Sequence, residues 1–226
     1  MVLVRPETPS NVGAAARALA NTGLESLVLV QPGDYRTVEC WRTAWGGHEI
    51  LEGARVAPDL LTAVASSHRV IALSGREGFH SVDIRDAAEG LRSLPPDTVV
   101  SLVFGPETSG LTLEELALCG QIARIPSHKA QPSLNLSHAV MVAAYEVFRA
   151  ATRAGVTPSA LATHGQKERL LDLLTHGLEA IHALSPREGS RYMREWRALV
   201  ARADLTSREI RLLEHAARKM IRAGGK

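Results

Sequence analysis

The sequence predicts an α/β fold with a mainly parallel sheet, followed by a small helical extension. Over residues 1–150, short runs of β-branched and aliphatic residues alternate with helix-like patterns. Such alternation is typical of a parallel sheet with helices on both faces. Residues 151–166 are rich in Ala, Thr, Gly and Pro, and helical patterns alone follow them. We therefore expect an α/β domain at 1–150, a linker at 151–166 and a helical extension at 167–226.

The expected strands are the runs of β-branched and aliphatic residues. They cover residues 2–4, 26–30, 54–56, 69–73, 98–104 and 121–125. The expected helices of the α/β domain cover residues 11–22, 37–45, 59–66, 83–92, 112–119 and 135–153. Those of the extension cover residues 167–184, 190–202 and 207–223.

Several helix starts carry capping residues. Ser10 or Asn11 is expected to start the first helix, and Asn135 and Ser137 are suited to cap the helix that follows them. Thr206 and Glu209 have the spacing of a capping box. In the helix at 135–153, apolar residues at helical spacing predict one buried face, made of Ala139, Val140, Val142, Ala143 and Val147.

Composition limits the class of protein. The chain has 226 residues, of which 45% are hydrophobic, but it has no apolar stretch near the roughly 20 residues that a membrane span needs. It also lacks the basic and apolar segments of a signal peptide, so we expect a soluble, cytoplasmic protein with no membrane partner. Cys40 and Cys119 lack the spacing of zinc ligands. We expect two buried thiols and no metal.

The charge is distributed unevenly along the chain. The net charge is +2, but residues 187–226 carry 11 basic and 5 acidic side chains, a local charge of +6. The rest of the chain therefore carries −4. A basic tail suits a polyanionic partner, because each Lys or Arg near a phosphate displaces condensed counterions. The plainer interpretation is a solvated helix surface, which is the commoner meaning of a charge run.

Three loops contain the residues that suggest a binding site. The first covers residues 11–17 after the first strand, the second 104–111, and the third 125–137. A fourth, Leu73-Ser74-Gly75-Arg76, also follows a strand. Ligands of parallel sheets bind beyond the carboxyl ends of the strands, where all four loops are expected. Taken alone, each loop is more often an ordinary strand-to-helix turn than a binding site, and neither a dinucleotide-binding glycine motif nor a P-loop is present.

Taken together, the loops resemble a known set of motifs. Asn11…Arg17, Phe104-Gly105-Pro106-Glu107…Gly110-Leu111 and Ile125-Pro126…Ser133-Leu134-Asn135-Leu136-Ser137 resemble the three signature motifs of the SPOUT-class RNA ribose 2'-O-methyltransferases, in order and spacing. Within this class, the chain is most similar to the bacterial TrmJ-type tRNA 2'-O-methyltransferases, and the likeness continues into the tail. This resemblance implies a deep trefoil knot, which is an exception among folds, a homodimer, and S-adenosylmethionine as the cofactor.

The resemblance also implies roles for individual residues. The residues expected to line the S-adenosylmethionine pocket are Leu73, Ser74, Gly75, Gly105, Ile125, Ser133, Leu134 and Asn135. The expected catalytic set is Arg17, Asn11, Glu107 and Asn135, in which Arg17 matches the proposed catalytic arginine and the others order the site. Gln131-Pro132, just before Ser133, departs from the family pattern.

Two roles for Arg17 remain open. Arginine normally stays protonated, so its use as a base requires a strongly lowered proton affinity. Alternatively, Arg17 anchors a substrate phosphate and positions the ribose hydroxyl, while another group or water takes the proton. The bland interpretation is an arginine on a helix surface.

Further arginines are expected to contact RNA phosphates, which dominate the contacts that position a nucleic acid. With Arg17, they are Arg5, Arg76, Arg191, Arg194, Arg197 and Arg202. Aromatic residues make up only 4% of the chain, so recognition by shape and backbone is expected rather than extensive base stacking.

The leading hypothesis is an enzyme that methylates a ribose 2'-hydroxyl of tRNA, at nucleotide 32 of the anticodon loop by likeness to the nearest group. An alternative keeps the chemistry and changes the target to another tRNA position or to ribosomal RNA. A third hypothesis is a non-catalytic RNA-binding protein with the same fold. Intact Asn11, Arg17, Glu107 and Asn135 argue against the third.

Overall fold

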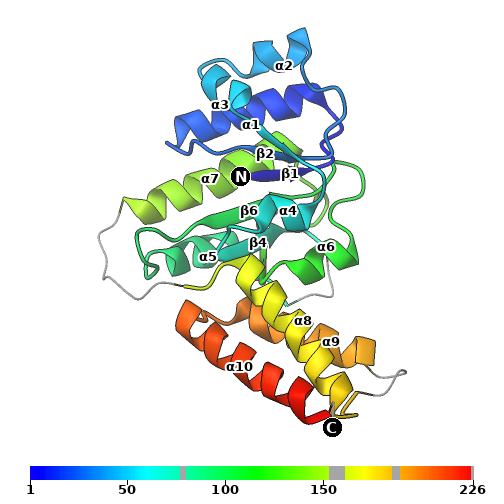
Figure 1. Ribbon diagram of the computed structural model, residues 1–226. Helices are drawn as coiled ribbons and strands as arrows, with labels where there is room; N and C mark the ends of the chain where they lie inside the picture. The colour runs from blue at the N-terminus through cyan, green and yellow to red at the C-terminus, as the bar shows by residue number, and fades with distance from the viewer. Residues whose placement is uncertain (77–79, 153–160, 185–188, 225–226) are drawn as a thin grey trace.

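The computed structural model describes residues 1–76, 80–152, 161–184 and 189–224. Its centre is a sheet of seven strands in the order β3-β2-β1-β6-β4-β7-β5, and every neighbouring pair is parallel. The predicted α/β fold with a parallel sheet is confirmed (Figure 1). The trefoil knot stays a prediction.

The strands lie close to where the hydrophobic runs predict them. They are β1 (Val2–Val4), β2 (Val28–Val30), β3 (Arg55–Ala57), β4 (Arg69–Leu73), β5 (Val82–Asp83), β6 (Val100–Phe104) and β7 (Gln121–Arg124). Only β5 was not predicted, because two residues are too short to show a periodic pattern. Asp83, expected inside a helix, instead precedes it and caps it by accepting a hydrogen bond from the Arg85 N–H at 2.8 Å.

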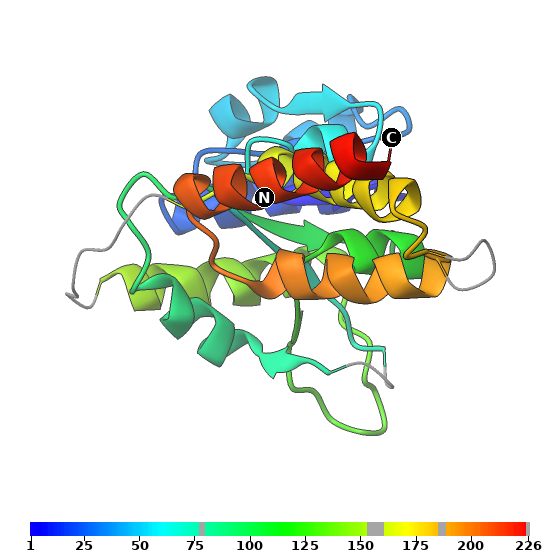
Figure 2. The same cartoon turned by 60° about the horizontal axis from the view of Figure 1, so that its bottom comes forward.

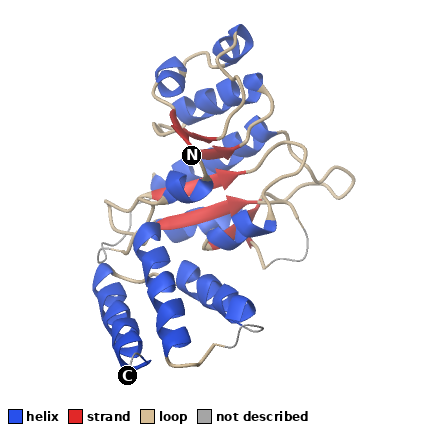
Figure 3. Ribbon diagram, turned by 45° about the vertical axis from the view of Figure 1, so that its right-hand side comes forward, coloured by secondary structure: helices blue, strands red, loops and turns tan. Residues whose placement is uncertain are grey.

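Helices cover both faces of the sheet (Figure 3). On one face lie α1 (Pro9–Asn21), α2 (Val38–Thr43), α3 (His48–Glu52), α5 (Ile84–Leu91) and α7 (Leu136–Ala151). On the other face lie α4 (Leu60–Val64) and α6 (Leu113–Leu118). Because successive side chains of a strand point to opposite faces of the sheet, each strand contributes to both layers. In β1, Leu3 belongs to the first core cluster, whereas Val2 and Val4 belong to the second.

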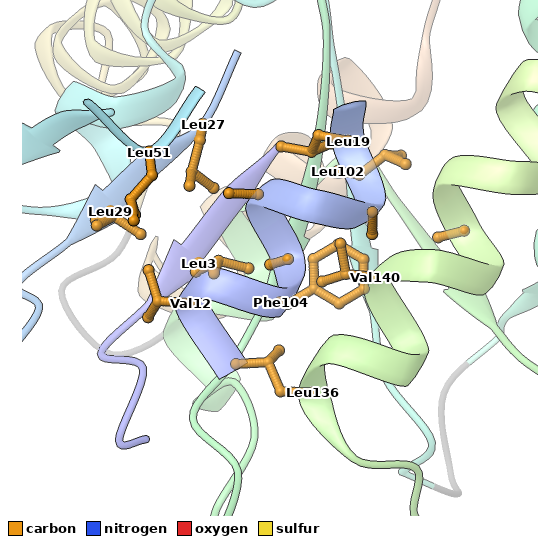
Figure 4. Close-up of a cluster of buried hydrophobic side chains, with 14 of the residues drawn as sticks. Leu3, Val12, Leu19, Leu27, Leu29, Leu51, Leu102, Phe104, Leu136 and Val140 are labelled. Carbon is orange, nitrogen blue, oxygen red and sulfur yellow. The ribbon is translucent and has the colours of Figure 1, made fainter. Parts of the chain in front are cut away.

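Helix α1 lies at the centre of the first layer. It packs against α2, α3 and α7, and Leu3, Val12, Leu19, Phe104 and Val140 pack together around it (Figure 4). The prediction that Ser10 or Asn11 starts this helix is wrong. The helix begins at Pro9 with Thr8 as the N-cap residue, because the fixed φ of proline suits the first helical position.

Two other helix predictions need correction. Helix α3 was not predicted, because its five residues directly follow Gly46-Gly47, which reads as a turn. In α7, Val140 and Ala143 are buried as predicted, but Val142 is 37% exposed. Val142 instead joins Tyr145 and Phe148 on an exposed apolar face of the helix.

The helical extension consists of α8 (His164–Ala180), α9 (Gly189–Arg202) and α10 (Ser207–Gly224), which share a separate small core. The predicted Thr206–Glu209 capping box is confirmed, since Thr206 N donates to Glu209 Oε2 at 2.7 Å and Glu209 N donates to Thr206 Oγ1 at 3.2 Å. Of the expected linker, residues 153–160 lie outside the described residues. Its C-terminal limit of 166 is wrong, because a second capping box, between Thr163 and Gln166, starts α8 at His164.

The extension packs directly on the sheet domain (Figure 2). Helix α8 contacts α4 and α9 contacts α6. Arg69 of β4 forms an ion pair with Asp204 just after α9, and the Gly165 N–H of α8 donates to the Ala65 carbonyl, just after α4, at 2.9 Å. In the part of the chain described here, no helix is long and apolar enough to cross a bilayer.

Candidate functional site

The loops that follow β4, β6 and β7, together with the start of α7, line a cavity of about 310 Å³. This is the expected place, beyond the carboxyl ends of the parallel strands. Seven of the eight residues predicted for the cofactor pocket line it: Leu73, Ser74, Gly75, Gly105, Ile125, Ser133 and Leu134. Asn135, the eighth, does not line it and has another role.

Glycine shapes the 104–111 loop. A Cβ on Gly105 would lie 2.3 Å from the backbone nitrogen of Leu111, so no larger residue fits without moving the backbone. Gly110 has a φ of +65°, which favours glycine, and its N–H donates to the Pro106 carbonyl at 2.9 Å. The loop therefore folds back on itself, with the backbone of residues 110–111 packed against Gly105.

Hydrogen bonds connect the loops around the cavity. Arg76 Nη2 donates to the Ser109 carbonyl at 3.2 Å, which ties the 73–76 loop to the 104–111 loop. Ser127 Oγ donates to the Pro132 carbonyl at 2.9 Å and closes the third loop on itself. The cavity wall is thus a connected structure assembled from segments far apart in sequence.

Three side chains from the three predicted motifs form a hydrogen-bonded chain. Asn135 Nδ2 donates to Asn11 Oδ1 at 3.0 Å, and Asn11 Nδ2 donates to Glu107 Oε1 at 2.8 Å. At the other end, Asn135 Oδ1 caps α7 by accepting from the Ser137 N–H at 2.9 Å and the His138 N–H at 3.3 Å. The start of α7 is therefore linked through α1 to the 104–111 loop.

Glu107 completes this network as a carboxylate. Burial by itself raises the pKa of Glu107, but hydrogen bonds from Asn11 and from the backbone N–H groups of Glu7 and Thr8 outweigh burial and hold the pKa below its ordinary value. The two backbone donors lie at 2.8 and 3.1 Å. Asn11, Glu107 and Asn135 thus use their polar atoms on one another and on the backbone, which makes them positioning residues of the site.

Arg17 lies apart from this network. It is exposed, does not line the cavity, and has no hydrogen-bond or ion-pair partner among the described residues. Six helical residues separate Arg17 from Asn11 by about 9 Å along the axis of α1 and turn the two side chains to different sides of the helix. Asn11 points inward and Arg17 points to solvent.

The arginines predicted to contact RNA differ in their surroundings. Arg5 forms a two-bond ion pair with Glu115, and Arg197 pairs with Glu168. Arg191 lies 3.5 Å from a Glu195 carboxylate oxygen in an exposed pair. Arg194 and Arg202, both exposed on α9, have no such partner in the described part of the chain.

Several further residues line the cavity although they were not predicted for the cofactor pocket. Two of them had other predicted roles, Glu107 as a catalytic residue and Arg76 as an RNA contact. The others are Phe104, Pro106, Thr108, Ser109, Gly110, Leu111, Pro132, Leu136 and Ala139. Most of them lie within the predicted loops, so the loops themselves were the available signal. Leu136 and Ala139 lie on α7, and only the helical spacing after the Asn135 cap could have shown that they face the cavity.

The cysteines behave as the sequence predicts. Both are free and buried, and burial raises the pKa of Cys119 to about 12, with a smaller contribution from the nearby Glu115 carboxylate. Burial also raises the pKa of Cys40. Within the described ranges, no three His, Cys, Asp or Glu side chains come together in a way that could hold a metal ion.

Comparisons with known proteins agree on one family. Residues 1–145 match the model of the SpoU rRNA Methylase family. Over 151 residues, the chain is 41% identical to "tRNA (cytidine/uridine/adenosine-2'-O-)-methyltransferase TrmJ" of Pseudomonas aeruginosa (strain UCBPP-PA14), a match that covers 65% of this chain and 59% of that protein. The chain therefore matches less than two thirds of the length of that relative.

Two solved structures extend the comparison. TrmJ from Z. mobilis ZM4 matches with a TM-score of 0.82 and 30% identity, over 97% of each chain, so the similarity includes the helical extension. A structure described as "Structural insights into the 2-OH methylation of C/U34 on tRNA" matches with a TM-score of 0.56 and 31% identity, over 67% of this chain and 94% of that one.

Proposed function

The chain belongs to the SpoU rRNA methylase family, and we propose that it transfers a methyl group from S-adenosylmethionine to a ribose 2'-hydroxyl of tRNA. The observation that carries this proposal is the cavity that the loops after β4, β6 and β7 line together. The relatives named as tRNA methyltransferases support it.

The cavity fits the proposed cofactor. Its walls combine apolar side chains such as Leu73, Phe104 and Leu134 with the backbone groups of two glycine-containing loops. Adenosylmethionine has an aromatic base, a ribose and an amino-acid tail, which need such a mixture. The absence of a side chain on Gly105 lets the backbone of residues 110–111 pack directly against it, which fixes the shape of this wall of the cavity.

The chemistry divides between cofactor and protein. When bound, S-adenosylmethionine supplies an electrophilic methyl group on a positively charged sulfur. The protein has to hold the 2'-hydroxyl in line with that methyl group and to remove the hydroxyl proton as the new O–C bond forms. Alignment of this kind is worth several kcal/mol, and the Asn135–Asn11–Glu107 chain supports it by fixing α7 and the 104–111 loop relative to each other.

The proton acceptor is not Glu107 in this proposal. Glu107 lines the cavity, but hydrogen bonds from Asn11 and from backbone N–H groups outweigh the effect of burial and hold its pKa low, so it is a poor base. The two roles of Arg17 stay open, as a base in the assembled complex or as an anchor of the substrate phosphate. Arg17 points away from the cavity of its own chain. In either role, it therefore has to act at the cavity of another chain.

A homodimer would bring Arg17 to such a cavity. Helix α7 carries an exposed apolar face made of Val142, Tyr145 and Phe148, and α1, which bears Arg17, packs beside α7. We propose that this face joins two copies, so that Arg17 of one subunit serves the cavity of the other. Light scattering is expected to give the mass of a dimer, and Tyr145→Glu is expected to give a monomer, whereas Tyr192→Glu on exposed α9 should leave the dimer intact. A monomeric wild type contradicts this part of the proposal.

The proposed substrate is tRNA, modified at nucleotide 32 in the cytoplasm. The structural relative described for C/U34 makes another position in the same anticodon loop the first alternative. Ribosomal RNA follows, as the name of the matched family suggests. A non-catalytic RNA-binding protein is the remaining hypothesis, and the intact hydrogen-bonded chain of Asn11, Glu107 and Asn135 counts against it.

Incubation with methyl-labelled S-adenosylmethionine and unmodified tRNA, followed by nuclease digestion and mass mapping, tests the function. We expect label on a single ribose, at position 32. Label elsewhere in tRNA would keep the chemistry and reject the position, and no label with bound cofactor would reject tRNA as the substrate.

A variant pair tests the role of Arg17. Arg17→Ala should lose at least about 100-fold in transfer rate, in the range that general acid–base catalysis supplies, with unchanged cofactor affinity. Arg42→Ala removes an equally exposed arginine, on α2, and should transfer at the wild-type rate. Full activity of Arg17→Ala would reject both proposed roles of this residue.

A further inference from the structure

A second cavity lies between the sheet domain and the helical extension. Its volume is about 740 Å³, and none of the residues that line it also lines the first cavity. It is bounded by the amino-terminal halves of β4 and β7, by α6 and by α9. The wall on the side of the sheet domain is largely apolar, with Val70, Ile71, Val82, Leu116 and Ile122.

The wall formed by α9 is positively charged. Arg194 and Arg202 line the cavity, are exposed, and have no hydrogen-bond or ion-pair partner among the described residues. Arg69 also lines it, but its charge is balanced by Asp204. Among the described residues, no carboxylate lines the cavity, so within this part of the chain two positive charges face it without compensation.

This combination selects the class of ligand. An apolar wall accepts a flat, weakly polar ring system, and two free guanidinium groups favour phosphate oxygens. A purely apolar partner, such as a helix from another protein, would leave both arginines uncompensated. A nucleotide with an unstacked base satisfies both walls, and single-stranded RNA is recognised in this way, by bases splayed out from the strand and by arginine.

The two cavities lie close enough to hold one strand of RNA. Leu73, at the carboxyl end of β4, lines the first cavity, whereas Arg69, Val70 and Ile71 at the other end line the second. Five residues of strand span only about 13 Å. Helix α6 also connects them, because Leu111, two residues before α6, lines the first cavity and Leu113 lines the second.

We propose that the second cavity binds a nucleotide near the methylated one, with its base against the apolar wall and its phosphates on Arg194 and Arg202. This inference rests on the proposed function and deepens it. It gives the helical extension a specific task, since α9 completes a site that the sheet domain alone leaves open. It also explains why Arg194 and Arg202 have no partner within the described ranges while Arg197, on the same helix, is paired with Glu168.

Two kinds of variant test the cavity, one by volume and one by charge. Ala198 lines the cavity and is exposed on α9, so Ala198→Trp fills it without changing charge. Its matched control is Ala216→Trp, at an exposed position on α10. Arg194→Gln with Arg202→Gln removes the two charges, and Arg208→Gln with Arg211→Gln removes the same charge from exposed positions of α10.

The readout is the affinity of the full chain for an unmodified tRNA transcript, measured beside its affinity for S-adenosylmethionine. We expect Ala198→Trp to weaken tRNA binding by about tenfold or more, as the loss of one stacked base does, and Ala216→Trp to leave it unchanged. Arg194→Gln with Arg202→Gln should weaken tRNA binding more than Arg208→Gln with Arg211→Gln does. It should also lower the slope of log affinity against log salt concentration by about one to two. Cofactor affinity should not change in any variant.

Several outcomes would overturn the inference. The first is equal tRNA affinity of Ala198→Trp and wild type. The second is an equal loss of tRNA affinity for the two arginine pairs. The third is that Ala198→Trp changes the mass of the protein in solution and not its tRNA affinity, which would mean that a second copy of the chain occupies the cavity. In each of these cases, methyl transfer by the wild type would still support the proposed function. A wild type that binds no tRNA would overturn both proposals.

Photo-crosslinking identifies the ligand directly. In a tRNA transcript substituted with 4-thiouridine, we expect crosslinks to peptides that contain residues 113–122 or 194–202, and we expect their loss in Ala198→Trp. Crosslinks that persist in Ala198→Trp would contradict binding in the cavity.

Discussion

The substitution Asn11→Asp replaces the Nδ2 group of the hydrogen-bonded chain with a carboxylate oxygen, so that an attractive contact with Glu107 becomes a repulsive one. Asn11 is buried, and its Nδ2 donates to Glu107 Oε1 at 2.8 Å. In the variant, a carboxylate oxygen faces a carboxylate oxygen at this distance. The lost hydrogen bond to a charged group is worth about 1.5–3 kcal/mol, and repulsion adds to this, while the bond from Asn135 to residue 11 is retained. We expect the free energy of unfolding to fall by about 3 kcal/mol at pH 8.

The loss of stability caused by Asn11→Asp should become smaller as the pH falls. Repulsion raises the pKa of the carboxylate pair in the folded variant, so the folded state takes up a proton before the unfolded state does as the pH falls. One shared proton restores the hydrogen bond, and the penalty should shrink between about pH 8 and pH 5. In the wild type, Glu107 behaves oppositely: its folded pKa is lowered from 4.5, so its stabilising contribution is present above that value and is lost as the pH falls through the lowered pKa.

Urea denaturation at several pH values measures this effect. For a chain of this size, 3 kcal/mol corresponds to roughly 6–12 °C in Tm, so thermal unfolding can serve as a second probe. Asn21→Asp, at an exposed position of the same helix, is the control for added charge and should cost less than about 1 kcal/mol. A stability of Asn11→Asp within about 0.5 kcal/mol of wild type at pH 8, or a penalty that grows as the pH falls, would refute the reasoning.

Two further predictions concern the contact between the extension and the sheet. Burial, with Lys167 and Arg197 nearby, lowers the pKa of His164 from 6.5 to about 4. Between these two values the unfolded chain binds a proton that the folded chain does not. The free energy of unfolding should therefore fall by up to about 3 kcal/mol as the pH drops from 6.5 to 4. His164→Gln should flatten the curve between pH 6.5 and 5 in urea titrations, and an unchanged slope would contradict this assignment. A Cβ on Gly120 would lie 2.3 Å from the Ala201 carbonyl oxygen, so Gly120→Ala should cost about 1–3 kcal/mol. Gly90→Ala in α5 should not destabilise the protein, because its Cβ meets nothing within 4 Å. Equal stabilities of Gly120→Ala and Gly90→Ala would argue against close packing of α9 on the sheet domain.

The fold was largely predictable because its strands carry strong local signals. Val2–Val4 is fully buried, as a run of Val and Leu in a parallel sheet should be. The predictions failed where the signal was short or lay in the caps. β5 has two residues, and the Thr163–Gln166 capping box moved the start of α8 into the expected linker.

The site was predictable as a set of loops but not as a geometry. Asn135 and Asn11 are 124 residues apart and form a hydrogen bond at 3.0 Å, and no local pattern records which distant polar groups meet. The resemblance grouped Asn11 and Arg17 as catalytic residues. The structure separates a buried positioning residue from an exposed arginine, because six residues of helix turn the two side chains to different sides.

The second cavity could not be predicted from the sequence. Its walls come from the sheet domain and the extension, which are separated along the chain by residues 152–163. The sequence showed only that residues 187–226 are basic. Arg197 is paired with Glu168, whereas Arg194 has no partner in the described part of the chain, and this difference depends on the packing of α8 against α9.

Calorimetric titration of S-adenosylmethionine into the wild type and into Gly105→Ala most directly tests the claim that the loops after β4, β6 and β7 form a cofactor site. The Cβ added at Gly105 collides with the Leu111 backbone and distorts the cavity, while Gly90→Ala controls for the substitution itself. We predict one cofactor bound per wild-type chain and per Gly90→Ala chain. For Gly105→Ala that still shows a folded circular dichroism spectrum, we predict a loss of affinity of about tenfold or more, the equivalent of about 1.4 kcal/mol. No binding to the wild type, or equal binding to folded Gly105→Ala, would contradict the account.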